Sequence, residues 1–239
     1  MSARSQQPAT LVWMRDRERG SRPALSEEKI VRAAIRLADA EGIDALSMRR
    51  IATEMGSGTT SLYRHITNKD ELIELMVDAV YGEMPLPDPP GEDWLADLTD
   101  VARTFRAALL EHPWLAQQAS RRPALGPNVI RQSDHALAVV GRATDDATQA
   151  AVVVSSVNTF VLGSVASELA ELEAQRTTGM TEDEWQNSVG AYVRQVVDSG
   201  RFPHFSRRIL DADELEPDDR FEFGLGCLLV GIAAALGCR

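Results

Sequence analysis

Side chains able to bind an anion or a base edge lie together in the stretch from Thr59 to Lys69. Hydroxyl residues begin it at Thr59, Thr60 and Ser61, and Arg64 and Lys69 add positive charge. A small hydroxyl side chain at the start of a helix permits a close approach to base edges, and an α-helix fits the major groove of B-DNA. Arginine can reach a guanine or a phosphate. This chemistry favours a nucleic-acid contact, with an ordinary solvated face as the alternative.

Helical geometry decides which of these side chains face outward. At 100° per residue, Leu62 and Ile66 share one side of a helix and are expected to pack inward. Thr60, Ser61 and Arg64 then project on the opposite side, with Thr59, Tyr63 and His65 flanking them. For His65, a buried hydrogen-bonded side chain remains an alternative. Lys69 follows Asn68 at the start of the next helix, where backbone N–H groups and the helix dipole favour an anion.

Catalysis is not expected from this sequence. An enzyme needs a nucleophile with a base and an orienting group, or a phosphate loop, and the chain contains no GxSxG, HExxH or P-loop motif. Its four histidines (65, 112, 135 and 204) are scattered, which predicts no metal site and no cofactor. The two cysteines, Cys227 and Cys238, are too far apart on one helix for an intrachain disulfide, and a reducing cytoplasm is the expected compartment.

The elements that position the candidate residues are helices. An apolar stripe from Ile30 to Ala38 follows the N-cap Ser26, and Gly42 ends that helix. Ser47 caps a second helix, Gly56-Ser57-Gly58 forms a turn, a short third helix runs from about Thr59 to Ile66, and Asn68 caps a fourth. Short helices joined by a tight glycine turn predict a three-helix helix-turn-helix domain, which with the fourth helix occupies residues 26–84.

The rest of the chain is also predicted to be helical, so the expected fold class is all-α. Pro85–Gly91 breaks the helical pattern and is the expected boundary before a larger domain at 92–239. Leu95–Leu109 shows heptad-like spacing, and Thr181 with Glu184 has the spacing of a capping box. Further helices are expected at about 114–120, 127–141, 144–175, 181–199 and 217–237.

Net charge is distributed unevenly along the chain. The whole chain carries −11, but residues 1–25 contain five arginines against two acidic residues and are expected to form a flexible basic arm. A passive tail is the alternative for this arm. Most of the acidic excess falls in the C-terminal part, and salt screens charges beyond about 10 Å. The negative total therefore does not exclude a local DNA-binding face.

One uncharged stretch, Ala147–Ser167, is long enough to span a bilayer. Eight of its positions are Thr, Gln, Ser or Asn, which favours a buried helix, and no membrane partner is expected. Phe223–Cys238 is apolar nearly all round, like a helix buried on every side. Two such helices from each subunit predict a four-helix dimer interface, with burial inside one monomer as the alternative.

Longer motifs resemble those of the tetracycline-repressor family. They are Leu46-Ser-Met-Arg-Arg-Ile-Ala-Thr-Glu-Met-Gly56, Leu62-Tyr-Arg-His-Ile66 and Asn68-Lys-Asp-Glu-Leu72, with a weaker likeness at Phe223–Gly231. One departure is the turn, commonly Gly-Val-Ser, which here reads Gly56-Ser57-Gly58. The resemblance implies a regulator of transcription, expected to be a repressor, that binds palindromic operator DNA as a homodimer and is released by a small-molecule effector.

The resemblance also assigns roles to single residues. It implies base readout by Arg49 and backbone phosphate contacts by Tyr63, His65 and Lys69, whereas Arg50 is open between a phosphate contact and solvation. An effector pocket is expected between the helices of residues 92–175, and a DNA-binding protein without an effector is the alternative. The candidate pocket residues, each of which can also be plain core, are Trp94, Phe105, Trp114, Gln117, Ser155, Asn158 and Thr159, with Ser156 beside them.

Overall fold

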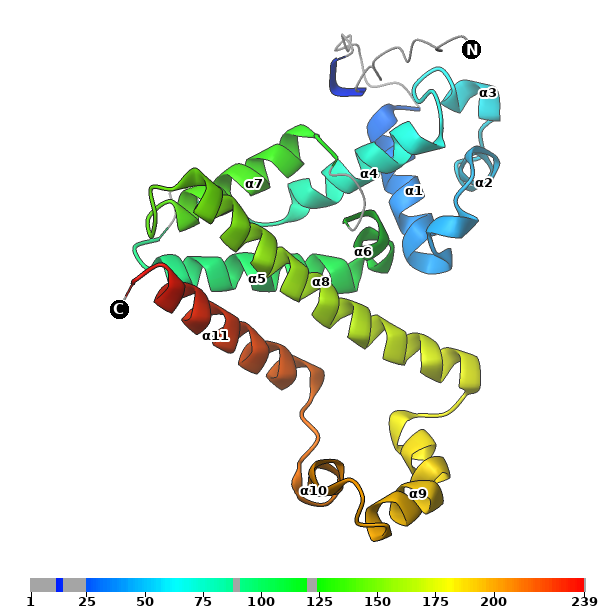
Figure 1. The fold of residues 1–239 in the computed structure, drawn as a ribbon. Coiled ribbons are helices and arrows are strands. Elements are labelled where there is room, and N and C mark those ends of the chain that lie inside the picture. Colours follow the sequence, from blue (N-terminus) through cyan, green and yellow to red (C-terminus); the bar gives the residue numbers. More distant parts are fainter. Residues whose placement is uncertain (1–11, 15–24, 88–90, 120–123, 239) are drawn as a thin grey trace, which may run out of the picture. The chain divides into compact units, whose positions relative to one another are not determined.

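The computed structural model describes residues 12–14, 25–87, 91–119 and 124–238 and shows only helices and their connections in those ranges (Figure 1). The predicted all-α fold class is confirmed. The chain divides into two compact units, residues 1–154 and 155–239. The helices are η1 (Val12–Met14), α1 (Glu27–Glu41), η2 (Ile43–Ala45), α2 (Met48–Glu54), α3 (Thr59–Leu62), α4 (Lys69–Glu83), α5 (Trp94–Glu111), α6 (Pro113–Ala119), α7 (Pro127–Val140), α8 (Ala147–Thr178), α9 (Glu182–Asp198), α10 (Pro203–Asp211) and α11 (Pro217–Ala235).

Helices α1, α2 and α4 begin where their capping residues predict. The side chains of Ser26, Ser47 and Asn68 each accept a hydrogen bond from a backbone N–H in the first turn of the helix that follows. The inward faces of helices α1 to α4 then form one small core. Its fully buried side chains are Ile30, Leu46, Ile51, Leu62, Ile66, Leu72 and Met76.

The first unit continues through α5, α6 and α7. Helix α4 packs along α7, and the two lie side by side in Figure 1. Helix α7 also packs on α5, and α1 contacts α6. The small N-terminal core is therefore fixed to the following helices at two places. The predicted domain boundary at Pro85–Gly91 lies inside this unit and stays a prediction.

The basic arm predicted at residues 1–25 lies outside the described residues, apart from Leu25 and the single 3-10 turn η1. Val12 in that turn is buried. The arm's expected contribution to binding stays a prediction.

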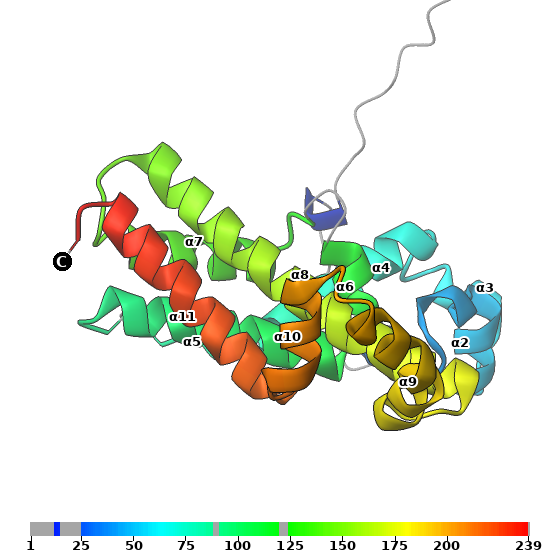
Figure 2. The ribbon, with the colours of Figure 1, turned by 60° about the horizontal axis from the view of Figure 1, so that its bottom comes forward.

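The second unit pairs the C-terminal part of α8 with α11, which run side by side in both views (Figures 1 and 2). The rings of Phe160 and Phe221 pack with their centroids 5.5 Å apart. Leu225 and Leu229 continue the buried face of α11. Every residue of α9 and α10, all of which the structure describes, keeps some exposure to solvent.

Helix α8 is long and apolar enough to cross a membrane, with a mean hydropathy of 1.6 over its most apolar window. The core helix of a water-soluble protein has the same length and composition. Val157, Val161 and Val165 are buried along one face of α8, while the opposite face between residues 152 and 166 is exposed and uncharged. In this structure 28% of that apolar window is buried.

Candidate DNA interface

The turn between α2 and α3 sets the geometry of the candidate interface. Gly56 adopts φ +61°, and its N–H donates to the carbonyl of Thr53. The N–H of Ser57 donates to the carbonyl of Ala52 at 2.8 Å. These two bonds form a Schellman motif, which requires the left-handed conformation that glycine adopts without strain. Gly58 then begins α3 as an N-cap without a side-chain hydrogen bond, because glycine replaces the usual capping residue.

The third helix is shorter than predicted. Regular helix ends at Leu62, and residues 63–65 form turns in which the N–H groups of His65 and Ile66 share the carbonyl of Leu62. Asn68, at φ −159°, is extended where it caps α4, so no helix can run on through this residue. The predicted orientation nevertheless holds, since Leu62 and Ile66 are fully buried.

The predicted contact residues of this segment lie on its solvent face. Thr60, Tyr63 and Arg64 are exposed, and 53% of Tyr63 is accessible. Thr59 and His65 are half-buried at the edges, where they were predicted to flank the face, but Ser61, which was predicted to project outward, is half-buried as well. His65 is therefore not the buried side chain of the alternative reading. The structure presents hydroxyl groups and one guanidinium on a single surface backed by an apolar core.

Arg49, Arg50 and Lys69 lie in the neighbouring helices of the same small domain. Both arginines are exposed on α2. The guanidinium of Arg50 binds the carboxylate of Glu41 at the end of α1, and this contact raises the pKa of Arg50 above its ordinary value. The ammonium of Lys69 donates to the carbonyl of Ile43 at 3.3 Å. Arg50 and Lys69 thus have partners at the end of α1 and in η2, the connection that follows it.

The start of α4 is held by two hydrogen bonds of Glu71. The N–H of Glu71 donates to Asn68 Oδ1, and Glu71 Oε2 accepts from the N–H of Thr67. Glu71 is buried, so its carboxylate serves this turn. The arrangement fixes Lys69 at the first position of α4, beside the end of the segment that carries Tyr63 to His65.

Asp39 joins the candidate DNA-binding domain to the elbow between α5 and α6. Its Oδ1 accepts from the indole N–H of Trp114 at 2.7 Å and lies 2.8 Å from Nδ1 of His112. Both aromatic side chains are buried. Trp114, considered above as a pocket residue, thus directs its polar atom to α1. Asp39 and His112 were missed because they lie 73 residues apart, and the sequence carries no signal for a pair at that distance.

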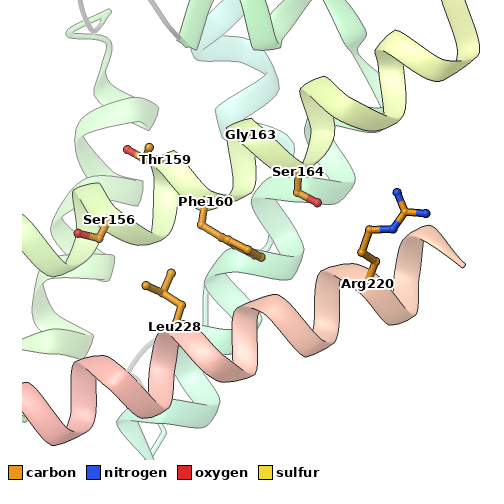
Figure 3. Close-up of a pocket in the computed structure, with 7 residues that line it drawn as sticks. All are labelled: Ser156, Thr159, Phe160, Gly163, Ser164, Arg220 and Leu228. Atoms are coloured by element: carbon orange, nitrogen blue, oxygen red, sulfur yellow. The ribbon is translucent and has the colours of Figure 1, made fainter. Parts of the chain in front are cut away.

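The structure also contains a hollow of about 530 Å³ between α8 and α11 (Figure 3). Its side chains are apolar and hydroxyl-bearing, with one guanidinium at the end where α11 begins. Figure 3 shows the ring of Phe160 lying between the two helices. The lining residues are Ser156, Thr159, Phe160, Gly163, Ser164, Arg220 and Leu228.

The hollow contains only part of the predicted pocket. Thr159 and its neighbour Ser156 line it, whereas Ser155 and Asn158 do not. Trp94 is half-buried and Phe105 buried on α5, while Gln117 is exposed on α6. Their roles in ligand binding stay predictions. Phe160 and Arg220 also line the hollow but were not predicted. The sequence offered a signal for each, since Phe160 is an aromatic residue among small ones and Arg220 is a charged residue beside an apolar segment. The described residues contain no cluster of metal-ligating side chains.

Two family models match the chain. "Bacterial regulatory proteins, tetR family" matches residues 30–76, and "Tetracyclin repressor-like, C-terminal domain" matches residues 86–236. Among curated proteins, the HTH-type transcriptional repressor DrrR1 of Streptomyces coeruleorubidus is 37% identical over 235 residues, which cover 96% of this chain and 86% of the relative. The tetracycline repressor protein class A from transposon 1721 of Escherichia coli is 29% identical and covers 87% of this chain and 91% of its own.

Solved structures show the same fold. The TetR family protein ActR of Streptomyces coelicolor, in complex with actinorhodin, superposes with a TM-score of 0.74. It is 31% identical, and the match covers 90% of this chain and all of ActR. Family models thus match both the N-terminal and the C-terminal part of the chain, and a repressor relative matches nearly its full length. The chain belongs to the tetracycline-repressor family of DNA-binding transcriptional regulators.

Proposed function

We propose that this regulator is a repressor that binds a two-fold symmetric operator as a homodimer and is released from it by a small-molecule effector. The observation that carries the proposal is the surface made by Thr60, Tyr63 and Arg64, which the buried Leu62 and Ile66 fix to the core. The base contacts fall to Arg49, Thr60, Ser61 and Arg64, and the phosphate contacts to Thr59, Tyr63, His65 and Lys69. Such a regulator acts at the chromosome, so we place it in the cytoplasm.

Exposed apolar and small side chains on the second unit support the homodimer. Phe223 and Val230, on one face of α11, are 70% and 71% exposed, and Cys227 lies between them. On α8, Thr159, Gly163, Ala166 and Ala170 form an exposed stripe without charge. Faces of this kind are stabilised when an identical pair covers them, as in a four-helix interface. The hollow between α8 and α11 adjoins these stripes and provides a recess for side chains of a second copy.

The effector proposal is supported by relatives. ActR has been solved in complex with actinorhodin and with (S)-DNPA. In the present chain, we propose that a small, largely apolar ligand binds among the helices of residues 92–175. Release follows only if this ligand binds the DNA-incompetent arrangement more tightly than the competent one. A hundredfold preference corresponds to about 2.7 kcal/mol of coupling.

The side-chain links of the first unit provide the route for that coupling. Movement of α6 acts on α1 through Trp114 and Asp39, and movement of α7 acts on α4 through the packing of those helices. The amide of Gln132 on α7 donates to the carbonyls of Tyr81 and Met84 at the end of α4. We propose that these links, together with the Pro85–Gly91 connection, change the separation of the two recognition surfaces in the dimer.

The test combines operator selection with sedimentation. Purified protein is used to select from random duplexes, and the enriched sequence is expected to be a palindrome whose half-sites lie about one helical turn, roughly 34 Å, or somewhat more apart. Sedimentation at micromolar concentration is expected to show a dimer. A clean monomer, or selection of sequences without a repeated half-site, would overturn the homodimer proposal.

Actinorhodin is the first probe for the effector, followed by apolar compounds that raise the melting temperature of the protein. Operator affinity is measured with and without each compound. A compound that stabilises the protein and lowers operator affinity supports release. If stabilising compounds leave operator affinity unchanged, the proposed switch is wrong; if none stabilises the protein, the effector-free alternative replaces it.

A further inference from the structure

The contact between Glu41 and Arg50 lies at the edge of the candidate DNA interface. Glu41 is the last residue of α1, and Gly42 turns the chain away at φ +83°. Arg50 lies in the first turn of α2, where its N–H donates to Ser47 Oγ. The side chain of Arg50 is 50% exposed and that of Glu41 is 40% exposed, while their charged ends are joined. Arg50 therefore stays half-exposed at the edge of the interface although its guanidinium is paired.

The effect of this ion pair on folding is expected to be small. Exposed ion pairs contribute little to stability, because solvent screens the attraction and ordering two long side chains costs entropy. The effect of the Glu41–Arg50 pair on DNA binding has another cause, the release of counterions from DNA. Each cation that neutralises a phosphate releases counterions, and a cation already neutralised by a carboxylate contributes less to that release. Glu54 adds a second, weaker negative influence on Arg50.

We propose that Glu41 is an affinity-setting residue of the DNA interface, whose carboxylate occupies the Arg50 donors that a backbone phosphate would use. The inference rests on the proposed DNA-binding function and adds a residue to it. By holding Arg50, Glu41 keeps one phosphate contact per subunit from forming fully, and so it weakens the sequence-independent part of binding. Without this carboxylate, Arg50 pairs with phosphate on any duplex, specific or random.

The substitution Glu41→Gln tests the proposal, because it removes the charge and keeps the size of the side chain. The matched control is Glu28→Gln, which removes the same charge from the same helix, where Glu28 pairs with Arg32 at 2.8 Å. Binding to a labelled random duplex is measured by fluorescence anisotropy over a series of KCl concentrations. Neither the operator sequence nor an effector is needed.

We expect Glu41→Gln to bind the random duplex more tightly at low salt, with a salt slope steeper by about 0.9 per bound subunit. A fourfold increase in salt then weakens Glu41→Gln about three- to fourfold more per subunit than it weakens the wild type. Glu28→Gln is expected to keep the wild-type slope. In a double-mutant cycle, Glu41→Gln is expected to lose its effect on the slope when Arg50 is replaced by Gln.

The outcomes separate this proposal from the proposed function. If the wild type binds DNA but Glu41→Gln and Glu28→Gln have equal slopes, the role of Glu41 is wrong and the DNA-binding function stands. If Glu41→Gln steepens the slope equally in the Arg50→Gln background, the effect is general charge and the pairing argument fails. If the wild type binds no duplex even at low salt, the proposed function itself fails. Thermal melting of each variant establishes that the folded protein is compared.

Discussion

Asp78, in the middle of α4, caps the start of α7 at Asn128. Its Oδ1 accepts from the backbone N–H of Asn128 at 2.8 Å and of Val129 at 3.1 Å, and its Oδ2 accepts from the Asn128 amide at 2.9 Å. The carboxylate is buried, and it satisfies the first N–H groups of α7, a helix that begins about 50 residues later in the sequence and whose N-cap Gly126 has no side chain. Gly126 makes the approach possible, because a Cβ there would lie 2.1 Å from Asp78 Oδ1.

Replacing Asp78 by Ala is expected to lower the free energy of unfolding by about 2 kcal/mol or more. Loss of an N-cap costs about 1 kcal/mol, and buried donors left without a partner cost a further 1–3 kcal/mol. Urea unfolding measures the change. Asp134→Ala, at an exposed position of α7, is the control and should stay within about 0.5 kcal/mol of wild type. Equal losses in the two variants would contradict the capping role.

Trp114→Phe tests the link between α1 and α6. The substitution keeps most of the buried ring and removes the N–H that donates to Asp39. We expect a loss of about 1–2 kcal/mol in urea unfolding, since the acceptor is charged and only partly exposed. Trp94→Phe, which changes a half-buried indole on α5, is the matched control. The link contributes nothing if Trp94→Phe is as destabilising as Trp114→Phe.

Because Tyr81 is buried, the protein is expected to lose stability at alkaline pH. Burial raises the pKa of Tyr81 from its ordinary value of 10.0 to about 12. The folded state therefore holds the phenol proton more tightly than the unfolded state, and this contribution is complete below pH 10. As the pH rises from 10 to about 12 this contribution is lost, and the free energy of unfolding falls by up to about 3 kcal/mol. Across that range the free energy of unfolding should fall less in Tyr81→Phe than in Tyr192→Phe, because Tyr192 is 69% exposed in the wild type. Identical pH profiles would refute the assignment.

Replacing Arg49 by Ala and replacing Lys69 by Ala are expected to impair DNA binding in different ways. Arg49→Ala should cost about 1–3 kcal/mol and flatten base preference at one position per half-site. Lys69→Ala should weaken all sequences alike and reduce the salt slope by about one per subunit. Binding to the selected operator and to its single-base variants distinguishes the two. Wild-type affinity in both variants would show that the contacts are misassigned.

Val230→Glu tests the dimer face of α11. A carboxylate there would be desolvated by the second copy, so sedimentation is expected to show monomers at concentrations where the wild type is dimeric. Leu210→Glu is the control, because Leu210 is 69% exposed on α10, away from the stripes of α8 and α11. If Leu210→Glu dissociates the protein and Val230→Glu does not, the interface lies elsewhere.

Local signals in the sequence were sufficient for most of the helical framework. Ser26, Ser47 and Asn68 cap the helices that they were predicted to cap, and Thr181 with Glu184 forms the predicted capping box. Each of these features depends on residues within one helical turn. The alternation of buried Leu62 and Ile66 with exposed Thr60 and Arg64 is local in the same way.

Features that depend on distant residues were not predicted. Helix α10 was missed because Phe202, Phe205 and Ile209 form a short apolar stripe with little burial to require it. The partners of Asp39 and Asp78 lie 50 to 75 residues away, and one sequence carries no record of such pairs. Trp114 was considered for the pocket for the same reason, since an aromatic residue reveals its size but not the direction of its N–H.

The capping of α7 by Asp78 limits how freely the parts of this regulator can be recombined. A chimera that joins residues 1–84 to the C-terminal part of another family member would keep the Asp78 carboxylate but lose Asn128 and Gly126 as its partners. The buried charge would then lack its donors, and a side chain in place of Gly126 would overlap it. Engineered sensors with a new operator specificity should therefore take α7 together with the DNA-binding helices, or exchange the recognition residues of α2 and α3 alone.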